Sequence, residues 1–183
     1  MSTRECCSCK SRSYCFEPFY DLSVAIPSER RGLGSSLRRS FGKKDPLPMT
    51  SLEDCLASHT RSETLSDTSA VHCSTCKKKR KSLKRITIDR FPQILVVHLK
   101  RFVASGGRTV KLGAPVTYPL EGLDMSTYGT GNQDAPRLYD LVGRVNHFGS
   151  LHGGHYTACV KGTGDKWYTF NDAHVEECDE SGS

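Results

Sequence analysis

The sequence lacks any apolar run approaching the roughly 18 residues that a membrane-spanning helix needs. Its N-terminus, Met1 to Cys6, also lacks the apolar segment of a secretory signal peptide. The mean hydropathy is -0.48, and 36% of the residues are hydrophobic. We therefore expect a soluble protein with an ordinary core and no membrane partner, located in the cytoplasm, the nucleus or both.

Acidic residues are missing from residues 77–85, a run that holds seven of the 26 basic residues. Because the net charge of the chain is +6, this one run accounts for all of the excess. The run also lacks the interleaved aromatic residues on which single-strand binders stack bases. A solvated strand or a nuclear-import signal is therefore favoured, and a nucleic-acid partner is not expected. A zinc-bearing nucleic-acid binder stays open as an alternative.

A disulfide framework is not expected, because nine cysteines in a reducing compartment serve as metal ligands or free thiols. Cys6 and Cys9 form one C-x-x-C pair, and Cys73 and Cys76 form a second. Two such pairs supply four thiolates, which Zn²⁺ binds as a tetrahedron. We expect a structural zinc that ties two hairpin tips together, since a closed four-sulfur site leaves no open position for catalysis. The alternative is a set of unrelated free thiols.

Near the end of the chain, two short β-prone runs, 156–161 and 166–170, flank a loop of turn-forming residues, 162–165. This pattern predicts a β-hairpin with a four-residue connection. Its expected register pairs Lys161 with Asp165.

In that register His155 faces Asn171, with Cβ atoms roughly 5 Å apart. The amide of Asn171 or the neighbouring carboxylate of Asp172 then lies within reach of one ring nitrogen. A side chain so placed orients the base of a Cys-His-Asn or Cys-His-Asp triad. The alternative is a surface histidine in an ordinary hairpin. Two glycines before His155 and the Asn-Asp pair at the matching position favour the catalytic base.

Elsewhere the pattern predicts short elements separated by polar loops. A capping box headed by Thr50 or Ser51 predicts a short helix whose apolar face carries Leu52, Cys55 and Leu56. The expected strands are 16–26 (broken at Pro18), 83–89, 91–102 (its centre buried on both faces), 116–120 and 139–147. The expected loops are 27–49, 57–71 and the rest of 103–137, and residues 176–183 form an acidic tail.

Together these motifs resemble the ubiquitin-specific proteases, which are papain-like cysteine deubiquitinases built from fingers, a palm and a thumb. The resemblance covers about residues 4–175. The box around His155 and the His-Leu-Lys-Arg-Phe strand at 98–102 are specific when both occur in this order. The segments that carry it are Gly153–Ala158, Trp167–Asp172, Leu95–Phe102, Phe19–Ser23 and the two C-x-x-C pairs.

The resemblance implies an α+β fold, mostly the antiparallel β fingers and palm of a papain-like cysteine peptidase, with the helical thumb absent. Residues 1–183 would be a partial domain, with zinc-bearing fingers at about 4–90, palm at about 91–175 and a tail at 176–183. Such a fragment is expected to expose apolar surface and strand edges.

The resemblance also implies cleavage of isopeptide bonds at the ubiquitin C-terminus, with ubiquitin and ubiquitinated proteins as partners. His155 would take the thiol proton, while Asn171, with Asp172 beside it, would fix the imidazole tautomer. The four paired cysteines would hold the zinc of the fingers. The residues implied to contact substrate are Gly153 and Gly154, which leave room for its narrow Gly-Gly tail, and Tyr156.

The sequence departs from the family's pattern at the nucleophile, which lies in a Gly-Asn-Thr-Cys-like box before the first C-x-x-C. Only five residues precede Cys6. Cys159 cannot replace it, since four residues at about 3.3 Å each place it about 13 Å from His155. The family's closing strands after Asp172 are also expected to be absent. We therefore expect this chain alone to be inactive. A non-catalytic, zinc-stabilised ubiquitin-binding module is the alternative.

Overall fold

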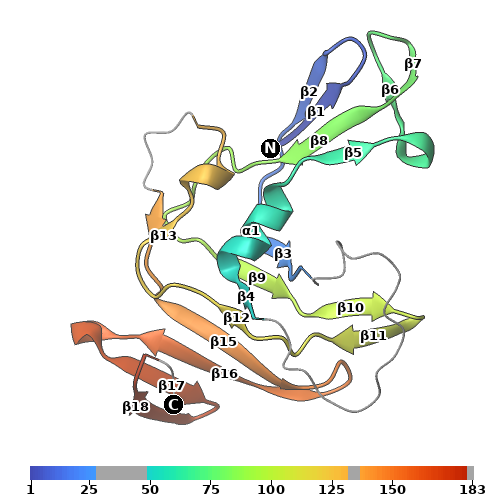
Figure 1. Cartoon of the computed structure of the whole chain (residues 1–183). Coiled ribbons are helices and arrows are strands. Elements are labelled where there is room, and N and C mark those ends of the chain that lie inside the picture. The colour runs from blue at the N-terminus through green and yellow to red at the C-terminus, as the bar shows by residue number, and fades with distance from the viewer. Residues whose placement is uncertain (28–48, 132–136, 181–183) are drawn as a thin grey trace. The chain divides into compact units, whose positions relative to one another are not determined.

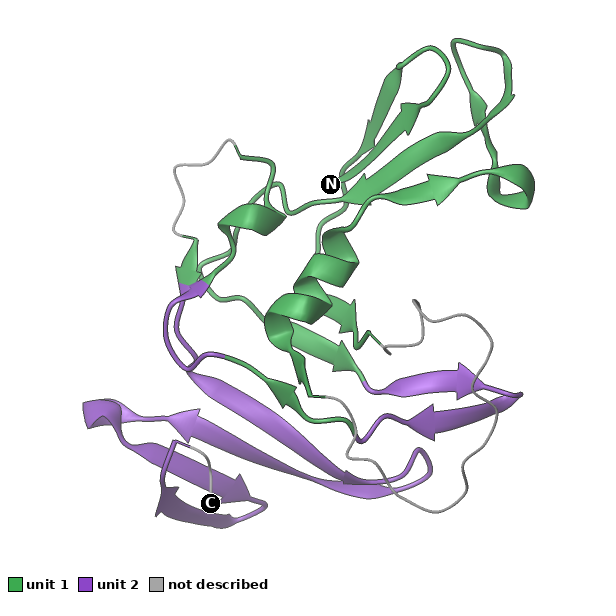
Figure 2. Ribbon diagram, viewed as in Figure 1, with its two compact units in different colours: residues 1–100, 114–118, 124–138 green, residues 101–113, 119–123, 139–183 purple. Residues whose placement is uncertain are grey.

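The computed structural model describes residues 1–27, 49–131 and 137–180, which form two compact units (Figure 2). The chain passes between the units several times, twice within short strands, β13 (Leu123–Asp124) and β14 (Leu138–Tyr139). The expected division near residue 90 into fingers and palm stays a prediction, because compact units group residues by packing and not by role. Unit 1 comprises residues 1–100, 114–118 and 124–138, and unit 2 comprises residues 101–113, 119–123 and 139–183.

Unit 1 is built from short strands and a helix (Figure 1). Its elements are β1 (Ser2–Cys6), β2 (Arg12–Cys15), β3 (Leu22–Ala25), β4 (Thr50–Ser51), α1 (Leu52–Thr60), β5 (Glu63–Leu65), the 3₁₀ turn η1 (Asp67–Ser69), β6 (Val71–Cys73), β7 (Lys78–Arg80), β8 (Ser82–Ile86), β9 (Val97–Lys100), β12 (Val116–Thr117) and the 3₁₀ turn η2 (Ser126–Tyr128).

The strands of unit 1 pair mostly antiparallel. A four-stranded sheet has the order β2-β1-β8-β5, and β6 and β7 form a separate hairpin. Two parallel pairs, β3 with β9 and β4 with β12, complete the unit. The long-range pairing of β1 with β8 brings the two C-x-x-C segments to the same end of the sheet.

Helix α1 begins where the capping box predicts. The Asp54 backbone N–H donates to Ser51 Oγ at 3.0 Å, and the Ser51 N–H donates to Asp54 Oδ2 at 3.0 Å. Cys55 and Leu56 are fully buried beside β3, together with Val24. The expected loop over 57–71 is wrong, because α1 continues to residue 60 and β5 adds to the main sheet.

Unit 2 is an antiparallel meander with the strand order β15-β16-β17-β18, accompanied by the hairpin of β10 and β11. Its buried side chains include Cys159 and Trp167. The elements are β10 (Phe102–Ser105), β11 (Arg108–Lys111), β15 (Gly143–Gly149), β16 (Gly154–Lys161), the 3₁₀ turn η3 (Thr163–Asp165), β17 (Trp167–Asn171) and β18 (His174–Cys178).

Three further expectations about strands are wrong. The segment 91–102 is not a strand buried on both faces, because β9 starts only at Val97, alternates in burial, and follows an exposed Ile94. The hairpin of β10 and β11 replaces an expected loop. The expectation that no strand follows Asp172 is also wrong, since Asp172 adopts a left-handed φ of 52° that reverses the chain into β18 (His174–Cys178). A strand therefore does follow the Asn-Asp pair.

The mostly antiparallel α+β character that the sequence predicts is confirmed. The expected exposure of apolar side chains is also observed, for example at Tyr20, Ile94 and Val145. Within the described ranges, no helix has the length and apolarity to cross a membrane. The expected loop at 27–49 lies almost wholly outside the described residues.

The packing of α1 predicts that Leu56→Ala destabilises unit 1 by about 2–5 kcal/mol, because the side chain is fully buried and its loss leaves a cavity. Hydrogen exchange of the α1 amides in increasing urea measures the change. Leu138→Ala is the matched control, since that leucine is 64% exposed and should shift stability by less than about 1 kcal/mol. Equal effects of the two substitutions would contradict the assigned core.

Candidate functional site

The two C-x-x-C segments form hairpin tips of the same design. In each tip a lysine four residues after the first cysteine donates its backbone N–H to that cysteine's carbonyl: Lys10 to Cys6 at 2.9 Å and Lys77 to Cys73 at 2.8 Å. Both lysines adopt a left-handed φ, 61° and 56°. The first tip connects β1 and β2, and the second connects β6 and β7. Each tip therefore folds its two sulfurs toward the same side.

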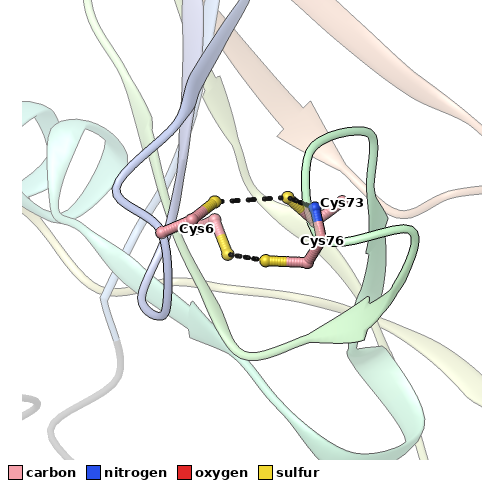
Figure 3. Close-up of side chains that lie close together, drawn as sticks. Cys6, Cys73 and Cys76 are labelled. Atoms are coloured by element: carbon pink, nitrogen blue, oxygen red, sulfur yellow. Dashed lines mark hydrogen bonds between the residues drawn. The ribbon is translucent and has the colours of Figure 1, made fainter.

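The four predicted metal ligands lie together, with all their Sγ atoms within 4.8 Å of one another. Cys6 Sγ lies 4.0 Å from Cys76 Sγ, and Cys9 Sγ lies 3.6 Å from Cys73 Sγ (Figure 3). A tetrahedron with metal–sulfur bonds of about 2.3 Å has edges of about 3.8 Å. The observed spacing therefore fits a metal ion held by four thiolates.

The protonation of this cluster is uneven. Hydrogen bonds, first among them one from Ser11, lower the pKa of Cys73 to about 5. A hydrogen bond with Cys9, followed by burial, raises the pKa of Cys76 to about 12. Four thiolates this close repel one another, so one thiol keeps its proton while no cation is near. A divalent cation would remove that repulsion, and its binding would release protons.

In unit 2 the predicted hairpin is present with a different register. β16 and β17 pair Lys161 with Trp167 and Ala158 with Phe170, so the ladder is shifted by two residues from the expected one. The connection is five residues long, 162–166, and Gly162 N–H donates to the Lys166 carbonyl at 2.7 Å. The predicted pairing of Lys161 with Asp165 is therefore wrong as a ladder pair. The two side chains instead form an ion pair at 3.0 Å.

The shift does not separate the predicted catalytic residues. Since side chains alternate with a period of two, a shift of two residues keeps His155 and Asn171 on the same face, as diagonal rather than direct neighbours. His155 Nε2 lies 2.5 Å from Asn171 Oδ1. An amide oxygen only accepts, so in this arrangement Nε2 carries the proton and Nδ1 keeps a lone pair. His155 is thus oriented to act as a base through Nδ1.

The neighbouring Asp172 occupies the tight turn between β17 and β18, where it adopts the left-handed φ noted above. Within the part of the chain that the structure describes, His155 donates its side-chain hydrogen bond to Asn171 Oδ1 and not to this carboxylate. Tyr156 points to the opposite face of the sheet from His155, because consecutive strand residues alternate. The sequence alone did not show that His155 and Tyr156 lie on opposite faces of the sheet.

The loop before His155 is held by backbone and lysine contacts. Ser150 N–H donates to the Gly153 carbonyl at 2.9 Å, closing the turn between β15 and β16. Lys111 Nζ, from β11, donates to the carbonyls of His147 at 2.7 Å and Gly149 at 3.1 Å. Through Lys111, the hairpin of β10 and β11 therefore fixes the start of the loop that leads to His155.

His147, which no motif of the sequence singles out, lies in β15 and packs against two aromatic rings of unit 2. Its ring lies 4.6 Å from the Tyr156 ring and 5.9 Å from the Phe102 ring, measured between centroids. Its Nδ1 atom is buried and has no hydrogen-bond partner among the described residues. The pairing of β15 with β16 places His147 opposite Tyr156, so correct pairing of these two strands would have predicted this contact.

The two glycines before His155 have different surroundings. A Cβ added to Gly154 would collide with His147 Nε2 and with the Phe148 carbonyl. A Cβ added to Gly153 would meet no atom within 4 Å. Gly154 is therefore required by the packing of the hairpin itself, whereas the packing places no such demand on Gly153.

The basic run 77–85 begins at the last residue of the second hairpin tip, Lys77, and continues through β7 and most of β8. Lys78 and Lys79 are exposed, and Lys84 forms an ion pair with Glu63 at 3.1 Å. This placement agrees with the interpretation of the run as solvated strands. His152 and His174 are exposed.

Comparison with known proteins identifies the relatives of this arrangement. A family model described as ubiquitin carboxyl-terminal hydrolase matches residues 3–183. Ubiquitin carboxyl-terminal hydrolase 3 of Homo sapiens is 41% identical over 181 residues, which cover 96% of this chain and 33% of the relative. Ubiquitin carboxyl-terminal hydrolase 21 of Homo sapiens is 38% identical over 181 residues, covering 98% and 29%. The chain thus spans about a third of the length of these curated relatives.

Solved structures give the same result. The SAGA DUB module Ubp8/Sgf11/Sus1/Sgf73 bound to monoubiquitin matches with a TM-score of 0.76 and 31% identity, covering 98% of this chain and 36% of that chain. The same module bound to ubiquitin aldehyde matches with a TM-score of 0.75 and 28% identity, covering 98% and 37%.

The contrast between the two glycines generates a stability prediction. Gly154→Ala should destabilise unit 2 by about 1–3 kcal/mol, since the added methyl group displaces His147 or the backbone of β15. Gly153→Ala, the matched control, should change stability by less than about 1 kcal/mol. Urea denaturation followed by the fluorescence of Trp167, the one tryptophan in the sequence, measures both. A harmless Gly154→Ala would contradict the packing described here.

Proposed function

The chain belongs to the ubiquitin carboxyl-terminal hydrolase family, and on this basis we propose that it supplies the base side of a cysteine-type deubiquitinase active site. The substrates would be ubiquitin conjugates, cleaved at the isopeptide bond that follows the ubiquitin C-terminus. The observation that carries the proposal is the hydrogen bond between His155 and Asn171, which presents Nδ1 of an exposed imidazole as a proton acceptor.

In the proposed mechanism, His155 Nδ1 takes the proton of a cysteine thiol, and the thiolate attacks the carbonyl carbon of the scissile bond. The resulting imidazolium gives its proton to the departing lysine amine, leaving a thioester. His155 then takes a proton from water, whose oxygen attacks the thioester carbonyl. The C–S bond breaks, the ubiquitin carboxylate is released, and the sulfur leaves as a thiolate paired with the imidazolium. Asn171 is the positioning residue that holds the ring through Nε2, with Asp172 beside it in the turn.

We propose that none of the nine cysteines of the sequence serves as the nucleophile of this mechanism. Four of them make up the metal-ligand cluster. Cys159 is buried in contact with Cys178, about 13 Å along β16 from His155. Burial also raises the pKa of Cys159, which disfavours the thiolate that attacks a carbonyl. We propose that a polypeptide of these 183 residues binds substrate without turning it over.

Gly153, Gly154 and Tyr156 are proposed to line the path of the substrate's C-terminal tail. All three are exposed, and they flank His155 in the chain. The fold leaves open space where a Gly153 side chain would stand. A ligand that passes close to the backbone accounts for a glycine at such a position, and the Gly-Gly end of ubiquitin is narrow enough to do so.

We propose that the ion held by Cys6, Cys9, Cys73 and Cys76 is zinc. Four thiolates at tetrahedral spacing select a soft, tetrahedral ion, and a closed sulfur set gives it a structural role. It would fix the tips of the β1–β2 and β6–β7 hairpins to each other. These hairpins are proposed as part of a ubiquitin-binding surface, in line with the ubiquitin complexes formed by the structural relatives.

The zinc proposal predicts one zinc ion per chain. Cys76→Ser should abolish stoichiometric zinc, measured by inductively coupled plasma mass spectrometry after dialysis, because three thiolates leave the tetrahedron incomplete. Cys15→Ser is the matched control and should retain the metal, since the exposed Cys15 lies outside the cluster. Zinc-free wild-type protein would contradict the assignment.

The catalytic proposal is tested with ubiquitin that carries a C-terminal fluorophore. The 183-residue chain alone should release none. The same chain should release fluorophore after the segment of human ubiquitin carboxyl-terminal hydrolase 3 that precedes the matched region is fused ahead of Met1. His155→Ala in the fusion should lower kcat/KM by at least about a hundredfold, because general base catalysis contributes about 10²–10⁴-fold.

The matched control for this assay is His98→Ala, which removes an exposed histidine of unit 1 and should leave turnover unchanged. Turnover by the 183 residues alone that is lost with Cys159→Ser would overturn the assignment of the nucleophile. A fusion that binds ubiquitin but never turns it over would instead favour a non-catalytic ubiquitin-binding module.

A further inference from the structure

Unit 2 contains a second pair of neighbouring sulfurs, separate from the metal-ligand cluster. Cys159 Sγ in β16 lies 3.5 Å from Cys178 Sγ, at the end of β18. The two strands are not adjacent, since β17 lies between them in the sheet. The sheet therefore curls enough for β16 and the edge strand β18 to bring these two side chains into van der Waals contact over β17.

The two thiols differ in access to solvent. Cys159 is only 1% exposed, and burial followed by the hydrogen bond with Cys178 raises its pKa. Cys178 is partly exposed and stands at the last rung of the ladder, opposite Trp167. Cys178 is thus the thiol that a small solute reaches first, with Cys159 held behind it as a partner.

We propose that Cys159 and Cys178 are an oxidation site that forms an intrachain disulfide when the protein meets a peroxide. The proposal rests on the contact between the two sulfurs and not on the deubiquitinase function. The sulfurs must approach from 3.5 Å to about 2.05 Å. Because Cys178 is the final residue of β18, it can make this movement while the other ladder pairs stay intact.

The chemistry balances with hydrogen peroxide as the two-electron oxidant. The Cys178 thiolate attacks one peroxide oxygen, the O–O bond breaks, and the departing oxygen leaves as water after taking up protons. The sulfenic acid formed on Cys178 is then attacked by the Cys159 sulfur. The S–S bond forms, the S–O bond breaks, and the hydroxyl leaves as water with the Cys159 proton. Two thiols and one peroxide thus give one disulfide and two waters.

The disulfide would close a ring that contains the whole of β17. Asn171, the positioning residue for His155, ends that strand, so the ring encloses the segment on which the proposed base depends. Cross-linking removes the openings in which β18 detaches and β17 frays. Oxidation is therefore expected to make local opening of the strand that carries Asn171 less frequent, without adding any group to the site.

A peptide map tests the proposal directly on the zinc-loaded 183-residue chain. Trypsin releases residues 145–161, whose one cysteine is Cys159, and residues 167–183, whose one cysteine is Cys178. After mild peroxide treatment and blocking of remaining thiols with N-ethylmaleimide, these two peptides should appear linked. The linked species should be lighter than the two peptides together by two hydrogen atoms and should disappear on reduction.

The matched variants are Cys178→Ser, which should abolish the linked species, and Cys15→Ser, which should preserve it. Hydrogen exchange of the β17 amides gives a second readout that needs no variant, and oxidation should slow it at least about tenfold. The proposal is wrong if Cys178 is oxidised to the sulfinic acid while Cys159 stays free to react with N-ethylmaleimide after denaturation. It is also wrong if either cysteine links mainly to a residue of the metal cluster.

Discussion

The hydrogen bond from His155 to Asn171 depends on the antiparallel meander that carries both residues. Neither residue is buried, so no core contact fixes their side chains. Their distance is set instead by the ladder of β16 and β17, which is anchored at the other end by the buried Trp167. Because strand side chains alternate strictly, any even register keeps the two on one face and any odd register separates them. The geometry of the His155–Asn171 pair is therefore a property of strand pairing, because the turn at 162–166 fixes the register of β16 and β17.

The metal-ligand cluster depends on a different kind of constraint. Each hairpin tip places two sulfurs by local backbone geometry. A lysine with a left-handed φ donates its backbone N–H to the carbonyl of the first cysteine. The pairing of β1 with β8 then brings the two hairpin tips together, although they are more than 60 residues apart in the sequence. The result is a cluster in which the pKa of Cys73 is lowered and that of Cys76 is raised, a charge distribution that a bound divalent cation would balance.

Local patterns predicted much of this architecture. The capping box at Ser51, the hairpin after His155 and the pairing of the two C-x-x-C segments all depend on residues near one another in sequence or on simple ligand chemistry. The register was missed because Lys161 and Asp165 attract each other as side chains, which looks the same in sequence as a ladder pair. The strand β18 and the packing of His147 against Tyr156 were missed, because both follow from strand pairing, which composition does not reveal.

The central claim is that Asn171 holds His155 in the tautomer that leaves Nδ1 free to accept a proton. Long-range ¹H–¹⁵N correlation spectra of the imidazole, recorded at a pH where the ring is neutral, measure this tautomer directly. The account predicts a protonated Nε2 and an unprotonated Nδ1 in the wild-type chain, and an exchanging mixture of tautomers in Asn171→Ala. A wild-type ring protonated at Nδ1, or one that already averages between the two forms, would contradict it.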